Sequence, residues 1–78
     1  SGTTIQYSLS SGAEVRLDVH DLAGRVVAVL EEGRRGPGPH AARWDGRTAG
    51  GTRVASGVYF VRLATDREVA VRPLVVLR

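Results

Sequence analysis

Residues 13–20 read Ala-Glu-Val-Arg-Leu-Asp-Val-His and form the most regular stretch of the chain. Apolar side chains stand at every second position, and charged or polar side chains stand between them. Successive side chains of a β-strand point to opposite faces of a sheet, so this alternation predicts a half-buried strand with its odd-numbered residues inward. We therefore expect a fold built from two-sided strands around an apolar core.

Turn residues stand on both sides of this stretch. Residues 10–12 precede it as Ser-Ser-Gly, and residues 21–24 follow it as Asp-Leu-Ala-Gly, where Gly24 can supply the positive φ of a tight turn. Beyond these turns we expect an alternating strand over residues 4–10 and a strand over residues 25–31. The second of these is apolar on both faces, which predicts a central or covered position.

The second half of the chain is richer in glycine and proline. Residues 32–39 contain three glycines and two prolines, which predicts a long exposed loop crossing between sheets. Pro73 has no N–H for a strand ladder, so it predicts an edge position or a bulge in the last strand. The further strands are expected over residues 40–45, 52–54, 58–65 and 68–77.

These segments together predict the fold class. No window shows a helical period, and turn signals recur roughly every 8–12 residues, which is typical of a sandwich or barrel. Consecutive hairpins with one long connection predict two packed antiparallel sheets, an all-β immunoglobulin-like sandwich of about seven strands. We expect a single domain over residues 4–78, with residues 1–3 as a vector remnant or linker.

Composition excludes several kinds of site. The chain has 78 residues and a formal net charge of +3, and all eleven basic residues are arginine. It has no cysteine, which excludes disulfides, thiol catalysis and cysteine-ligated zinc. No apolar run approaches the roughly 18–20 residues of a membrane-spanning helix. We expect no cofactor and no membrane span.

The general bases available at neutral pH are His20 and His40. A catalytic triad would need Ser56 with Asp18 or Asp45, and no motif joins these residues. We therefore expect no enzymatic activity, and we interpret the histidines as residues that close strands.

Small-ligand sites are equally weak in the sequence. Residues 45–50 begin like a calcium loop, but Arg47 and Ala49 stand where further carboxylates are needed. A carbohydrate site would depend on Phe60, which points outward by strand parity, and one exposed aromatic ring is a weak signal. We expect plain loop structure and no metal.

The arginines raise the question of nucleic acid. We expect outward positions for Arg16, Arg43, Arg62 and Arg72, among acidic neighbours, and a loop position for the pair at residues 34–35. Cross-strand ion pairs on a solvated face explain such a pattern as well as phosphate binding does. Nucleic acid is not expected as a partner.

Four residues are expected to determine structure. Trp44 and Tyr59 fall on inward positions, and Gly24 and Gly57 fall in turns. A tyrosine near the start of the penultimate strand often bonds back to the backbone at the corner of an immunoglobulin-like sandwich, and Tyr59 has that layout.

Four motifs resemble those of a family of bacterial C-terminal domains. Residues 19–27 resemble V-x-D-x-x-G-R-x-V, and residues 40–47 resemble H-x-x-x-W-D-G-R. Residues 54–63 resemble V-x-S-G-V-Y-F-x-R-L, and residues 72–78 resemble the apolar, basic-tipped tail of such proteins. Two related groups share these motifs: the immunoglobulin-like domain of flagellar hook-capping proteins and the C-terminal sorting domain of the type IX (Por) secretion system.

The resemblance implies a seven-stranded module attached to upstream domains of a larger parent protein. For the sorting group it also implies a secreted or cell-surface parent, exported through the outer membrane, and recognition of the terminal strand by the secretion machinery. Our main expectation is a sorting or surface-attachment signal. The alternatives are a permanent structural or assembly module, as in a hook cap, and a carbohydrate-binding module. The residues expected to bind the translocon are Arg72, Leu74, Val75, Val76, Leu77 and Arg78.

Overall fold

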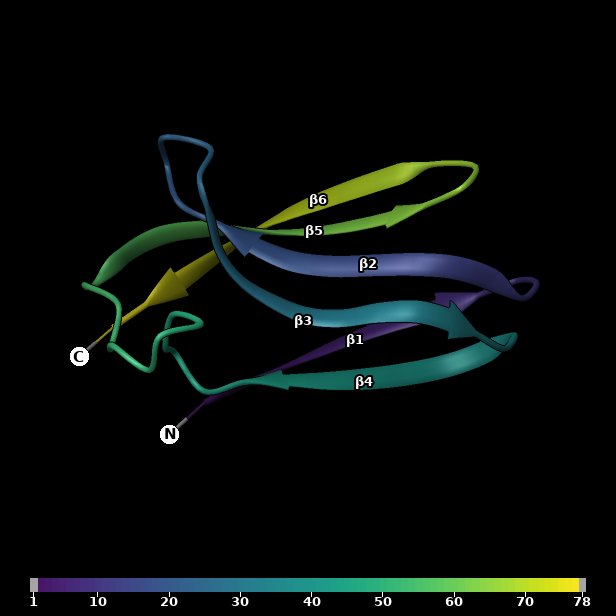
Figure 1. The fold of residues 1–78 in the computed structure, drawn as a ribbon, viewed down its shortest axis with the longest axis horizontal. Coiled ribbons are helices and arrows are strands. Elements are labelled where there is room, and N and C mark those ends of the chain that lie inside the picture. Colours follow the sequence, from purple (N-terminus) through teal and green to yellow (C-terminus); the bar gives the residue numbers. More distant parts are fainter. Residues whose placement is uncertain (1, 78) are drawn as a thin grey trace.

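The computed structural model describes residues 2–77, which contain six β-strands and no helix. A four-stranded sheet has the order β3-β2-β5-β6 and packs against a two-stranded sheet, β1-β4 (Figure 1). All pairings are antiparallel, so the all-β sandwich is confirmed. The strands are β1 (Thr3–Leu9), β2 (Ala13–His20), β3 (Val26–Arg35), β4 (Gly38–Trp44), β5 (Gly57–Thr65) and β6 (Val69–Val76).

The core lies between the two sheets and is centred on β2. The four odd-numbered residues of β2 are buried, as the alternation predicts. β2 lies between β3 and β5, so both of its edges are hydrogen-bonded. Trp44 from the small sheet meets Tyr59 from the large sheet edge to face, with ring centroids 5.8 Å apart. This contact joins the two layers.

The prediction of a long loop over residues 32–39 is wrong. β3 continues to Arg35 and β4 begins at Gly38, so only Gly36 and Pro37 connect them. The additional residues of β3 pair with Ala13 to Arg16 of β2, and these ladder bonds outweigh the weak strand preference of glycine and charged residues. The connection does cross between the two sheets, as expected.

β3 is also not central, in contrast to the prediction from its apolar faces. It lies at one edge of the large sheet and contains two bulges opposite β2, which pass over Val27 and Leu30. Each bulge changes the parity of the strand. Val27 and Leu30 therefore pack against the core, whereas Val26 and Val29 are exposed on the outer face.

Two expectations for the second half are wrong. Residues 52–54 form no strand, and only a single bridge joins Arg47 to Arg53. β6 has no bulge at Pro73, because its pairing with β5 is continuous from Val69 to Val76. Pro73 does lie on an edge strand, where a missing N–H is tolerated. The apolar pattern of β6 changes parity because its first valines point outward.

Candidate interaction surface

The outer face of β5 and β6 carries a continuous group of apolar side chains. The register places Phe60 beside Pro73 and Val58 beside Val75, all on the face opposite the buried Tyr59 and Val61. The valines of β6 are widely exposed, at 54% for Val69, 47% for Val71 and 59% for Val75. We call this surface the outer apolar face; it consists of Val58, Phe60, Val69, Val71, Pro73 and Val75.

Such a surface is typical of a protein contact. Single exposed apolar residues are ordinary, but a contiguous apolar patch with a polar rim usually marks an interaction site. Here the rim includes Arg62, which stands beside Asp18 of β2 and Val71 of β6. The face is a sheet surface and not a pocket, so it fits another flat surface better than a small ligand.

Asp18 is buried on the same outer face, although its strand position points away from the core. Its side chain is 1% exposed and accepts a hydrogen bond from Arg16 Nε at 2.8 Å. His20 Nε2 lies 2.8 Å from the other carboxylate oxygen, and His20 Nδ1 lies 3.2 Å from the carbonyl oxygen of Gly24. The partly exposed Arg16 and His20 side chains therefore enclose the carboxylate. Sequence patterns show that Asp18 points outward but do not show that it is enclosed.

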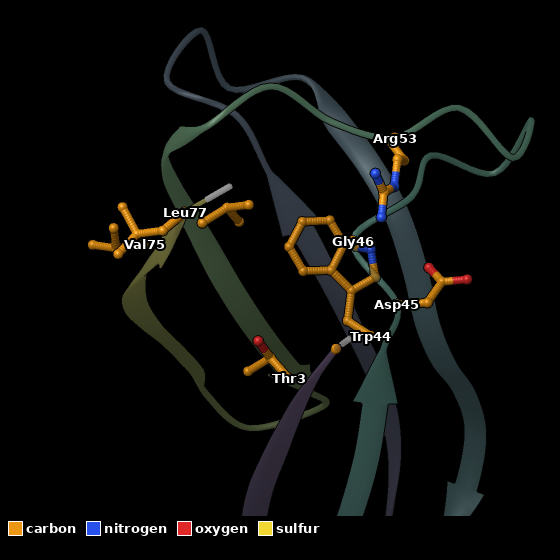
Figure 2. Close-up of a pocket in the computed structure, with 9 residues that line it drawn as sticks. Thr3, Trp44, Asp45, Gly46, Arg53, Val75 and Leu77 are labelled. Carbon is orange, nitrogen blue, oxygen red and sulfur yellow. The ribbon is translucent and has the colours of Figure 1, made fainter.

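A cavity of about 490 Å³ opens where β1 begins and β6 ends. Figure 2 shows Trp44 and Gly46 on one side of the cavity, Leu77 across from them, and Arg53 above. Thr3 of β1 forms part of the lining. The cavity has no cluster of acids or bases that could perform chemistry, and it belongs to the junction between the two sheets.

The expected translocon-binding residues do not share one face. Leu74 and Val76 point inward and pack against the core clusters. Val75 points outward, and Leu77, which is 84% exposed, follows the end of β6. Arg78 lies outside the described residues. Leu74 and Val76 are thus occupied in packing, and Val75 and Leu77 are free to contact a partner.

Arg72 is not on the outer face. It stands opposite the buried Val61, so it belongs to the inner side of β6, where it is nevertheless exposed. Arg43 lies on the exposed side of the small sheet, and Arg16 pairs with Asp18 and Glu32 on the large sheet. The expectation of four outward arginines therefore fails for Arg72. Arg16 and Arg62 share the outer face of the large sheet, on either side of Asp18, whereas Arg43 and Arg72 lie on other surfaces, so the four do not form one basic patch.

The residues expected to determine structure lie at strand ends and turns, and Tyr59 stands at the corner before β5. The hydroxyl of Tyr59 donates a hydrogen bond to the Ala55 carbonyl oxygen at 2.7 Å. Trp44 is 2% exposed, and its Nε1 donates to the carbonyl oxygen of Arg47 at 2.9 Å. Gly57 begins β5 with φ of +152°, and Gly24 has φ of +85° in the turn after β2.

A second polar cluster ties β1 to β3 at the other end of the sandwich. Tyr7 donates a hydrogen bond from its hydroxyl to Glu31, and its ring stacks on His40 at 5.1 Å between centroids. Burial, together with the Glu31 carboxylate, raises the pKa of Tyr7 to about 12. Arg35 lies near Glu31 and opposes this shift. The cluster stabilises packing and has no free reactive group.

The residues of the alternative sites lie apart or are occupied. His40 bonds to the carbonyl oxygen of Gly36 and His20 bonds to Asp18, and within residues 2–77 neither histidine is hydrogen-bonded to Ser56. Asp45 accepts a hydrogen bond from the backbone N–H of Arg47. In the part of the chain that the structure describes, no three His, Asp or Glu side chains gather as metal ligands. No helix there is long and apolar enough to span a membrane.

Comparisons with known proteins identify similar domains. The family model of the FlgD Ig-like domain matches residues 1–68. The crystal structure of FlgD from P. aeruginosa superimposes with a TM-score of 0.74 at 22% identity, covering 96% of this chain and 59% of that chain. This identity shows a shared fold alone, and the chain spans less than two thirds of the FlgD chain. A comparison with curated proteins gave no significant match.

Proposed function

Because the chain belongs to the family of FlgD Ig-like domains, we propose that it is a permanent assembly module of a larger exported protein. The family is a structural domain, so the chain is not an enzyme. FlgD belongs to the hook-capping proteins, one of the two groups that the sequence motifs resemble. The comparisons give no support to the type IX sorting domain, which was our main expectation.

The outer apolar face is the observation that carries the proposal. Val69, Val71 and Val75 expose apolar surface on the sheet, and Phe60 and Pro73 stand beside one another on the same face. Burial of apolar surface drives protein association at roughly 25 cal/mol per Å² before the costs of binding. The module binds the surface of another folded domain of the assembly through this face.

The division of the last residues between core and surface also favours a domain that the mature protein keeps. Leu74 and Val76 contribute to the core, so removal of the last strand would expose apolar residues of β5 and destabilise the sandwich. A sorting signal that the secretion machinery binds as an unpaired strand would not need this packing. The export of the parent protein, to the medium or the cell surface, remains part of the proposal.

Intact-mass analysis of the parent protein from its native culture tests whether the mature protein keeps the domain. Retention of the domain, residues 4–78, in the mature protein is the expected result. Loss of the domain after export would overturn the assembly reading and favour a cleaved sorting signal.

Cross-linking of the parent protein tests whether the outer apolar face makes the assembly contact. Val71→Glu places a charge in the outer apolar face and should lower the assembled fraction at unchanged folding. Ala41→Glu is the matched control, since Ala41 is exposed on the outer side of the small sheet. Equal assembly of the two variants would contradict the assignment of the outer apolar face.

A further inference from the structure

The free edge of β1 is unlike the other strand edges within residues 2–77. β1 pairs with β4 alone, and its sequence, Thr-Thr-Ile-Gln-Tyr-Ser-Leu, has no charge, proline or glycine. An unpaired row of N–H and C=O groups accepts another strand, so native proteins usually block such edges with charges, prolines or bulges. β1 has none of these protections.

The other three edges are protected. β3 has two bulges and four charged residues near its end. β4 begins with Gly38 and Pro39 and carries Arg43. β6 contains Pro73 and Arg72. The contrast singles out β1 as the edge that is free to pair.

The inner side of β6 is uncovered next to this edge. Leu74 and Val76 are half-buried, and Ala70 and Arg72, which also face inward, are exposed. The corresponding inward residues of the central strand β2 are all buried. A large sheet of four strands therefore extends beyond a small sheet of two strands, and no strand within residues 2–77 pairs with the free edge of β1.

We propose that one extended segment of the parent protein, adjoining Thr3 on its N-terminal side, pairs antiparallel with β1. It forms the third strand of the small sheet, of about the seven-residue length of β1. Its alternate apolar side chains cover Ala70, Leu74 and the half-buried Leu63. This inference rests on the proposed function, since it requires a larger parent protein.

The overhang of the large sheet beyond β1 favours one added strand over a second copy of the sandwich. Antiparallel pairing of β1 with β1 of another copy would keep the inner faces of both small sheets on the same side. The β5 and β6 strands of the two copies would then compete for the same volume. A single extended segment has no second layer and meets no such conflict.

The ends of the described chain support a segment of the same polypeptide. The N- and C-terminal ends lie at the same end of the sandwich, next to the cavity lined by Thr3 and Val76 (Figures 1 and 2). A short hairpin before Thr3 is enough to bring a preceding segment alongside β1. The solved FlgD chain also extends well beyond the matched part, which makes up 59% of that chain.

Hydrogen exchange measured by mass spectrometry tests this strand in the full parent protein and in the 78-residue chain. Only alternate amides of β1 point to β4, so the remaining amides of residues 3–9 face the free edge. We expect these amides to exchange at least about tenfold more slowly in the parent than in the short chain. Residues 38–44 of β4 provide the internal reference. Equal exchange of β1 in the two proteins would overturn the proposal.

Two adjacent substitutions distinguish this inference from the proposed function. Ala70→Glu places a charge under the added strand, and Val71→Glu places one on the outer apolar face. In the parent, Ala70→Glu should restore fast exchange to β1, and Val71→Glu should not. Lost assembly in Val71→Glu, together with unprotected β1 in the parent, would retain the assembly function and reject the added strand. Protection that appears only after a partner protein is added would also reject it, because the strand would then come from another chain.

Discussion

Tyr59 and Ala55 are joined by a hydrogen bond of 2.7 Å from the phenol hydroxyl to the backbone carbonyl oxygen. The bond spans the turn that leads into β5, and the ring packs in the core with Trp44. One side chain thus fixes the path of the loop and fills the core below it. The corner holds the start of β5 in register with β6, and therefore positions the outer apolar face.

Tyr59→Phe should lower the free energy of unfolding by about 1–2 kcal/mol, because the Ala55 carbonyl loses its partner while the ring remains. Urea denaturation followed by Trp44 fluorescence measures the change. Tyr59→Leu should cost more, since it also removes aromatic packing. A Phe variant as stable as the native chain would mean that water replaces the hydroxyl without loss.

Trp44→Ala should destabilise the chain by about 3–5 kcal/mol, the usual range for a buried aromatic residue. Trp44→Phe retains part of the packing and loses the hydrogen bond to Arg47, so a smaller loss of about 1–3 kcal/mol is expected. Thermal unfolding monitored by circular dichroism compares the two variants. A loss below about 1 kcal/mol in Trp44→Ala would contradict the burial of the indole.

The sequence predicted those features that depend on local pattern. The alternation of residues 13–20 identified the inward side of β2, and the turn at Gly24 follows from its place between two strands. The inward positions expected for Trp44 and Tyr59 match their burial. These features could be derived because strand parity and turn chemistry are properties of a few consecutive residues.

The remaining features depend on neighbouring strands. The bulges of β3 are set by its register with β2, which local sequence does not contain. In β6, the alternation of strand positions places Val71 and Leu74 on opposite faces. It does not show which of these faces is the core, because both carry apolar side chains. The burial of Asp18 requires Arg16 and His20 to close over it. Tertiary pairing, and not local propensity, determined these positions.

Tyr7 should titrate at high pH, with a pKa of about 12 against its usual 10.0. The raised pKa means that the folded state keeps the proton longer than the unfolded state. Its contribution to stability is complete below pH 10 and is lost as the pH rises to about 12. Absorbance of tyrosinate at high pH measures the midpoint, and Tyr7→Phe identifies the signal.

Glu31→Gln tests the cause of that shift. Burial is the main contribution, and the Glu31 charge adds to it. The midpoint of Tyr7 should therefore fall in the Gln variant and still remain above 10.0. A midpoint that does not move would show that the hydrogen bond to Glu31 does not influence the ionisation of the phenol.

Asp18→Asn should lower the free energy of unfolding by about 1–3 kcal/mol, because a charge-assisted hydrogen bond is replaced by a weaker one. An asparagine amide N–H that faces Arg16 meets a second donor, because the guanidinium group has no acceptor, which is unfavourable. Glu14→Gln is the matched control, since Glu14 lies on the same face of β2 and is exposed. Similar losses in the two variants would mean that the enclosure of Asp18 has no energetic effect.

Gly24→Ala isolates the cost of backbone conformation. Gly24 has φ of +85°, and a Cβ added there would meet no atom within 4 Å, so strain is the sole penalty. Asp21 caps this turn by accepting hydrogen bonds from the backbone N–H groups of Ala23 and Arg25, which prevents the turn from relaxing. We expect a loss of about 1–2 kcal/mol in chemical denaturation. Gly36→Ala is the control, because its Cβ is equally free and its φ lies outside the left-handed region; this variant should be neutral or slightly stabilising. Equal stability of the two variants would show that the turn at Gly24 adapts to a side chain, and that glycine is not required there.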